Sequence, residues 1–167
     1  MNYLSVALNS THKKEKFSCG NTPLDNYLHK QASQDIKRKL CACFVMEAET
    51  HKTIKGYYTL ANTSIDKQLI PANALKKLSP PYKSLPATLL GRLAVDTQFQ
   101  GKGIGALLLI DALKRSFQVA AHSIGSCAII VDPIDIKAIE FYKKYGFILL
   151  PDSGKLFLPM KTVAQLF

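Results

Sequence analysis

The chain has 167 residues, of which 47% are hydrophobic and 20% charged. This length suits one domain with its own hydrophobic core, and the composition is too apolar for a disordered chain. No apolar run approaches the roughly 18 residues that span a bilayer. A secretory signal has a basic segment ahead of an apolar stretch, and residues 1–16 do not show this pattern. We therefore expect a cytoplasmic protein with no membrane contact.

The basic residues exceed the acidic ones by 22 to 12, a formal charge of +10. Such an excess predicts a polyanionic partner, an acidic protein partner, or both. The positive residues recur in short clusters and form no basic tail, so any nucleic-acid contact is expected from a folded surface. The clusters are Lys13, Lys14 and Lys16; Lys37, Arg38 and Lys39; Lys76 and Lys77; Lys114 and Arg115; Lys143 and Lys144.

The four cysteines do not have the spacing of a metal site. They are Cys19, Cys41, Cys43 and Cys127. No pair has the two-residue gap of a metal knuckle, and no histidine stands at a ligand offset from them. We expect reduced structural cysteines and no metal.

The first half of the chain predicts a strand, a helix and a hairpin. Residues 3–8 have strand character. Thr22 is the expected N-cap, with Pro23 at the first helical position, and the apolar period continues to about Lys39. Residues 41–48 and 53–61 are predicted strands around a polar turn at Glu49 to Lys52, and residues 64–70 extend the second strand or begin another.

The second half alternates strands and helices. Four prolines (Pro71, Pro80, Pro81 and Pro86) bracket one short helical piece, ANALKKL, in an irregular connection. A buried strand is predicted over 87–95, a long helix over 104–121 and another buried strand over 126–132. Asp135 caps a helix through Tyr145 that Gly146 ends, and strands follow at 147–150 and 155–160. This order predicts one mixed sheet with helices on both faces, in a single domain over 1–167.

A glycine-rich turn between the strand at 87–95 and the long helix can hold an anion. Three glycines at alternate positions, Gly101, Gly103 and Gly105, let the backbone approach a ligand. The N–H groups and dipole of the following helix favour phosphate or pyrophosphate. A P-loop fails because Lys102 precedes a glycine instead of Ser or Thr.

Two other interpretations of the turn stay open on the residues alone. Gly101, Gly103 and Ala106 satisfy a dinucleotide fingerprint, but it comes late in the chain, and positions 120–126 lack the expected acid. The other is a helix start that happens to be rich in glycine.

The residues Gln100, Gly103 and Gly105 resemble the Q/R-x-x-G-x-G/A pyrophosphate loop of the GNAT acetyltransferase superfamily. The segments Arg92 to Asp96 and Phe141 to Phe147 are similar to GNAT features as well. The resemblance narrows to GNAT toxins of bacterial type II toxin–antitoxin modules and covers about residues 15–160. It rests on the phrases Phe17–Gly20, Leu24–Leu28, Gly56–Leu60, Gly91–Asp96 and Leu156–Pro159.

This resemblance implies an α/β (α+β) GNAT fold, a single mixed and mostly antiparallel sheet of six to seven strands flanked by about four helices. It also implies direct acetyl transfer from acetyl-CoA to an amine in a ternary complex, without a metal. The backbone of Leu93, Ala94 and Val95 would pair with the pantetheine arm. The pyrophosphate loop would comprise Gln100, Gly101, Lys102, Gly103, Ile104, Gly105 and Ala106.

The resemblance places the catalytic tyrosine at Tyr142, which would protonate the departing thiolate as a general acid. Tyr145, three residues on, is the alternative. No strong base is required, because an α-amino group has a pKa near 8 and is partly neutral at physiological pH. Asp132 and Asp135 stand where an asparagine often precedes the last helix in the family, which leaves a side-chain contact to CoA from this region open.

GNAT toxins of this type acetylate the α-amino group of aminoacyl-tRNA, which blocks translation. The resemblance thus implies an aminoacyl-tRNA substrate, a ribbon-helix-helix-type antitoxin and, as is common in the family, a homodimer. Candidate substrate contacts are Lys30, Lys37, Arg38, Arg92, Lys114 and Arg115. The alternative is a GNAT enzyme acting on a small-molecule amine or a protein N-terminus. A non-catalytic CoA-binding or nucleic-acid-binding module is disfavoured because the loop and Tyr142 are both retained.

Overall fold

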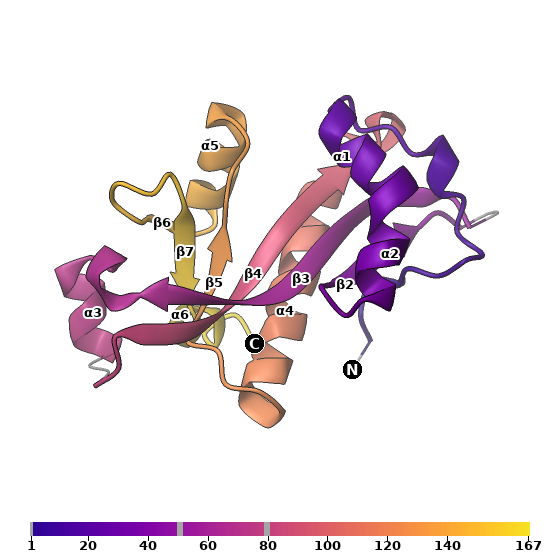
Figure 1. Cartoon of the computed structure of the whole chain (residues 1–167). Helices are drawn as coiled ribbons and strands as arrows, with labels where there is room; N and C mark the ends of the chain where they lie inside the picture. Colours follow the sequence, from indigo (N-terminus) through magenta and orange to yellow (C-terminus); the bar gives the residue numbers. More distant parts are fainter. Residues whose placement is uncertain (1, 50–51, 79–80) are drawn as a thin grey trace. The chain divides into compact units, whose positions relative to one another are not determined.

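A computed structural model describes residues 2–49, 52–78 and 81–167. The chain forms two compact units, the first from Met1–Ala61 and Gly91–Ala112, the second from Asn62–Leu90 and Leu113–Phe167. The boundary falls inside β3 (Ile54–Asp66), β4 (Ser84–Val95) and α4 (Ile104–His122), so three elements run through both units (Figure 1).

The strands form one seven-stranded mixed sheet in the order β1-β2-β3-β4-β5-β7-β6. β4 and β5 (Ala128–Val131) run parallel, whereas β1–β2, β2–β3, β5–β7 and β6–β7 are antiparallel. The remaining strands are β1 (Val6–Ala7), β2 (Ala42–Glu47), β6 (Ile148–Leu149) and β7 (Leu156–Pro159). The predicted single mixed sheet is confirmed.

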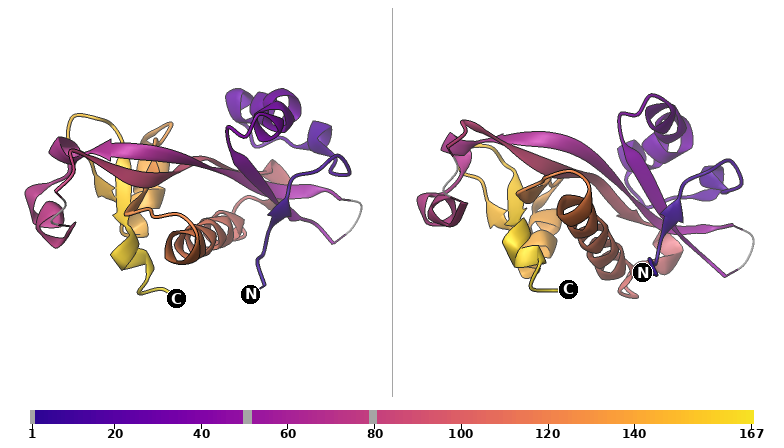
Figure 2. Two further views of the ribbon diagram at one scale, coloured as in Figure 1. Left: turned by 60° about the horizontal axis from the view of Figure 1, so that its bottom comes forward. Right: turned by 90° about the horizontal axis from the view of Figure 1, so that it is seen from below.

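The predicted first helix is present but begins and ends differently. Its N-cap is Asn21, whose side chain accepts from the Leu24 N–H at 3.1 Å, so Thr22 as the cap is wrong. α1 (Thr22–Asn26), a π-helical turn η2 (Tyr27–Gln31) and α2 (Ala32–Lys37) follow one another as a single helical stretch (Figure 2). The stretch ends two residues earlier than predicted, before Lys39, which has φ 61°.

The first unit has its own core. α2 packs against β2, and the apolar face of the helical stretch buries Tyr27, Leu28 and Ala32. These side chains join other buried residues of the unit in one cluster, whose other members are Leu8, Phe17, Cys43, Val45, Ile54, Tyr57 and Ala94. Burial of this apolar surface fixes the helical stretch against the sheet.

The predicted strand over residues 3–8 is reduced to two residues by a buried carboxylate. The Leu4 N–H donates to Asp111 Oδ1 at 2.6 Å, and the Ser5 hydroxyl donates to the same carboxylate. The Tyr58 hydroxyl also donates to it, at 2.7 Å. Asp111 on α4 therefore satisfies this segment's polar groups in place of a strand partner.

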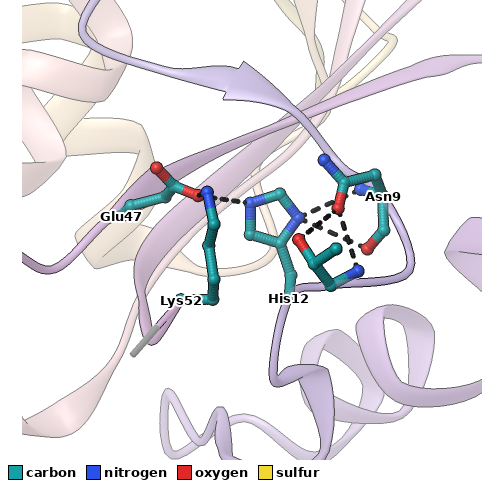
Figure 3. A network of polar contacts seen from close by, with 5 residues as sticks. Asn9, His12, Glu47 and Lys52 are labelled. Carbon is teal, nitrogen blue, oxygen red and sulfur yellow. Dashed lines mark hydrogen bonds and ion pairs between the residues drawn. The ribbon is translucent and has the colours of Figure 1, made fainter. Parts of the chain in front are cut away.

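A second polar network in the first unit joins Asn9, His12, Glu47 and Lys52 (Figure 3). His12 has a fully buried side chain and lies between Asn9 and Glu47. Its Nδ1 is 3.0 Å from the Asn9 N, and its Nε2 is 2.8 Å from Glu47 Oε1. The Lys52 ammonium donates to the same Glu47 oxygen at 2.7 Å. Residues 50 and 51 of the predicted hairpin turn lie outside the described residues.

The second unit packs around β5, in which all four residues are buried. α3 (Ala72–Leu78) coincides with the predicted helical piece. β4, however, begins at Ser84 rather than 87, because the strand's backbone already pairs there: the Cys127 N–H donates to the Pro86 carbonyl at 2.9 Å. α6 (Met160–Val163) packs on β5 and β7.

α5 (Ile136–Lys144) has the predicted caps. The Asp135 carboxylate accepts from the Ala138 N–H at 2.7 Å, and Gly146 has φ 89° after the last turn. Both ends of this helix are thus determined by local sequence. None of the helices in the described part of the chain is long and apolar enough to cross a membrane.

Candidate functional site

The glycine-rich turn of the first unit faces open space. Gly101 and Gly103 have φ of 74° and 79°, in the left-handed region. A Cβ at either position would meet nothing within 4 Å, so the space before the turn is open. α4 begins directly after, and its first-turn N–H groups, on Ile104, Gly105 and Ala106, have no acceptor within the helix. These donors and the helix dipole suit a pyrophosphate.

The segment that carries the turn is braced by its own side chains. The Gln100 amide donates to the carbonyls of Cys19 and Val95, both at 2.9 Å. The Lys102 ammonium donates to the Gln98 carbonyl at 2.9 Å and lies 5.5 Å from the centre of the Phe99 ring. The Gln100 amide therefore stabilises the loop and is not available to bind a ligand. Lys102 is exposed, so its charge lies at the surface of the turn.

The strand before the turn continues beyond its parallel ladder with β5. The β4–β5 register covers Thr88 to Leu90 and ends there, so Leu93 to Val95 lie past the end of the ladder. Gly56 of β3 approaches this stretch closely, since a Cβ there would lie 2.8 Å from the Ala94 carbonyl oxygen. The absence of a side chain at Gly56 fixes the position of this part of β4.

Tyr142 lies on α5 in the second unit and is buried. Its ring contacts Phe141 and Phe147, each at 5.2 Å between centroids. Burial raises the pKa of Tyr142 well above its usual value. Among the described residues, no hydrogen-bond partner is found for the Tyr142 hydroxyl. Every fully buried side-chain oxygen in the described part of the chain does have a hydrogen-bond partner. The Tyr142 hydroxyl is therefore not completely buried.

The other residues considered near Tyr142 have structural partners. Tyr145 is half-buried at the C-cap of α5, with its ring 5.2 Å from that of Phe141. The Asp135 carboxylate caps α5, and Asp132 pairs with Lys155 at 3.2 Å. Tyr142 is thus buried, whereas Tyr145 is only half-buried.

Two of the predicted substrate contacts meet in one pocket of the first unit. Lys30 of η2 and Arg92 of β4 line a cavity of about 420 Å³. The Arg92 guanidinium lies 3.4 Å from the centre of the Tyr27 ring. From the sequence, Tyr27 is predicted only to lie on the apolar face of the first helix. Its pairing with Arg92, 65 residues on, has no local signal.

The remaining predicted cations are not part of this pocket. Lys37 and Arg38 are exposed at the end of α2 in the first unit. Lys114 and Arg115 are half-buried on the part of α4 that belongs to the second unit. Within the described ranges, no group of three or more His, Cys, Asp or Glu residues could hold a metal, and the four cysteines are free.

A mixed sheet with a glycine-rich anion cradle after its central strand is the architecture of an acyl-CoA-dependent acyltransferase. The chain belongs to the acetyltransferase (GNAT) domain family, which matches residues 39–149. It is 37% identical over 151 residues to the tRNA-acetylating toxin of Mycobacterium tuberculosis, covering 90% of this chain and 87% of that protein. It is 28% identical to the probable toxin TacT of Sinorhizobium fredii, covering 93% and 89%.

Solved structures with the same fold come from toxins as well. A tyrosine-to-phenylalanine mutant of KacT superposes with a TM-score of 0.87 at 28% identity, covering 94% of this chain and 93% of that one. AtaT complexed with acetyl-methionyl-tRNAfMet gives a TM-score of 0.89 at 27% identity, with 99% of both chains covered. AtaTR bound with acetyl-CoA gives 0.82 at 25% identity, covering 98% and 96%.

Proposed function

We propose that this protein is a toxin that transfers acetyl from acetyl-CoA to the α-amino group of aminoacyl-tRNA and so blocks translation. The observation that carries the proposal is the 37% identity to a tRNA-acetylating toxin across nine-tenths of the chain. The structural neighbour complexed with acetyl-methionyl-tRNAfMet supports the same acceptor. The +10 charge suits a tRNA partner, because phosphate contacts dominate affinity for nucleic acids.

Acetyl-CoA fits the residues of the first unit. The open space before Gly101 and Gly103 and the first-turn N–H groups of α4 would receive the pyrophosphate. The backbone of Leu93 to Val95, beyond the end of the β4–β5 ladder, would pair with the pantetheine amides as an added strand would. Lys102 would add positive charge near a phosphate.

Tyr142 would act as the general acid. Because burial raises its pKa, the hydroxyl stays protonated at neutral pH and can donate to the sulfur as the carbon–sulfur bond breaks. The neutral amine forms the new carbon–nitrogen bond, and the proton that it loses restores the tyrosine through solvent. Tyrosine-to-phenylalanine mutants of the neighbours KacT and AtaT were solved, which supports attention to a tyrosine in this fold.

The proposal extends to organisation and partners. All 167 residues would form one catalytic domain, which the passage of β3, β4 and α4 through both units supports. Neighbouring AtaT structures include complexes with the antitoxin AtaR, one of them with bound DNA. We infer a comparable antitoxin of the ribbon-helix-helix type, a homodimeric toxin and a cytoplasmic site of action.

Induced expression in bacteria tests the proposal in cells. We expect growth arrest from the wild-type chain and normal growth from Tyr142→Phe at equal protein level, since the variant lacks the proton donor. Co-expression of the cognate antitoxin should restore growth. Unimpaired growth on expression of folded wild-type protein would count against a toxin and favour an enzyme for small amines or protein N-termini.

A further inference from the structure

The pocket between the first helical stretch and β4 is lined by two positively charged side chains. Lys30 and Arg92 supply the charge, and no Asp or Glu lines it. Pro23 and Leu24 add apolar surface, and Asn26 and Gln31 add side-chain amides. A cavity of about 420 Å³ with one apolar wall and two cations suits a ligand that has both a flat apolar part and an anionic group.

Arg92 is held by stacking, which leaves its hydrogen-bonding edge available. The guanidinium lies 3.4 Å from the centre of the Tyr27 ring, a close cation–π contact. In the described part of the chain, no hydrogen bond or ion pair engages Arg92. A stacked guanidinium keeps all five N–H donors in its own plane, where their fork matches two oxygens of a phosphate or carboxylate.

Tyr27 is a fixed platform for this arginine. Its hydroxyl donates to Asp35 at 3.0 Å and lies 3.2 Å from the Cys41 sulfur. Its ring is buried and stacks on Tyr57 with 6.5 Å between centroids. Asp35 also accepts from the Gln31 amide at 2.8 Å, a bond that, first among the causes, lowers the pKa of Asp35. The Asp35 carboxylate is thus occupied by two donors and holds the ring on which Arg92 lies.

We propose that this pocket binds a phosphodiester in the single-stranded 3′ end of the acceptor RNA, with Arg92 as the phosphate ligand, Lys30 as a second cation and Tyr27 as the positioning residue. The inference rests on the proposed function and names the part of the substrate that these residues hold. Unpaired RNA exposes backbone and unstacked bases together, and the apolar wall at Pro23 and Leu24 would receive a base or ribose beside the phosphate.

Steady-state kinetics on the full chain tests this assignment. We expect Arg92→Gln to raise the KM for aminoacyl-tRNA about tenfold, the effect of losing one charge-assisted bidentate contact, with little change in kcat. The dependence of log(kcat/KM) on log[salt] should become shallower by about 0.7, as for one phosphate contact to a single strand. Arg92→Lys should recover part of the KM because it keeps the charge and loses the fork.

Three further variants distinguish the effect of the pocket on the KM from the effects of general charge and of misfolding. Lys16→Gln removes one exposed cation of the first unit outside the pocket and should leave the KM nearly unchanged. Tyr27→Phe removes the hydroxyl bond to Asp35 but keeps the ring under Arg92, so it should raise the KM less than Arg92→Gln does. Tyr27→Leu removes the aromatic face and should raise it. Circular dichroism and thermal unfolding identify any variant that has lost its fold.

Kinetics with acetyl-CoA and with an acceptor that lacks phosphate show whether the pocket binds a phosphate of the RNA or of CoA. The KM for acetyl-CoA should be the same in wild type and Arg92→Gln, and so should the rate on the methyl ester of the amino acid, which has no phosphate. A raised acetyl-CoA KM would assign the pocket to CoA and overturn the inference. An unchanged aminoacyl-tRNA KM, or lost affinity for an antitoxin alone, would overturn it too. Failure of the wild type to acetylate any aminoacyl-tRNA would instead refute the proposed function.

Discussion

Replacing Gly103 with alanine isolates what the glycine-rich turn contributes to cofactor binding. Gly103 has φ 79°, and a Cβ there would meet no atom within 4 Å. The substitution therefore adds no clash and acts only through backbone strain. An L-residue in the left-handed region costs about 1–2 kcal/mol. If the turn relaxes to avoid that cost, binding must restore its shape, which weakens acetyl-CoA affinity by about 5- to 30-fold.

Calorimetric titration with acetyl-CoA measures the affinity, and urea unfolding measures the free energy of unfolding. The backbone strain can lower either quantity. We expect Gly103→Ala to lose affinity, stability or both, by a sum of about 1–2 kcal/mol. Gly103→Asn should lose less, because asparagine tolerates this conformation. Gly125→Ala is the matched control: its Cβ also meets nothing within 4 Å, and its φ lies outside the left-handed range. Wild-type affinity in a Gly103→Ala protein of wild-type stability would refute the role of the turn.

Three further predictions test other parts of the structure. Tyr142→Phe should keep acetyl-CoA affinity and lower kcat by about 10²- to 10⁴-fold, whereas Tyr145→Phe should stay near wild type; equal losses in both would leave Tyr142 without a special role. Gly56→Ala places a Cβ 2.6 Å from Leu108 Cδ1 and should destabilise the fold by about 1–3 kcal/mol in urea unfolding, in contrast to Gly125→Ala. Hydrogen bonds from Lys52 chiefly, and from His12, lower the pKa of Glu47 below its usual value of 4.5. The stability it contributes is therefore present above that value and lost as pH falls through the lowered pKa, so thermal unfolding between about pH 3 and pH 7 should show a flatter acid limb for Glu47→Gln.

Elements with local signals could be predicted from the sequence. The Asp135 cap and Gly146 stop fixed both ends of α5, because a capping carboxylate and a left-handed glycine act within one turn. The ANALKKL helix was found for a similar reason, since prolines on either side limit it. The mixed sheet then followed from the order of the elements.

Features set by distant contacts could not be predicted. The short first strand depends on Asp111, which lies more than 100 residues away from Leu4 and Ser5. The choice of Asn21 over Thr22 as the cap depends on one hydrogen bond that two neighbouring polar residues could equally offer. The pairing of Arg92 with Tyr27 arises only when β4 meets the first helical stretch. The glycine-rich turn could be located from the sequence, but the pocket lined by Lys30 and Arg92 could not.

Direct detection of the acetylated product tests the proposed acetylation of aminoacyl-tRNA. Purified wild-type protein is incubated with acetyl-CoA and a mixed pool of aminoacyl-tRNAs, the RNA is digested with a ribonuclease, and the 3′-terminal aminoacyl-adenosines are analysed by mass spectrometry. We expect one or more aminoacyl-adenosines that are heavier by one acetyl group on the α-nitrogen, and none of them with Tyr142→Phe. Unmodified aminoacyl-adenosines, in a sample where the same protein acetylates a small amine, would contradict it.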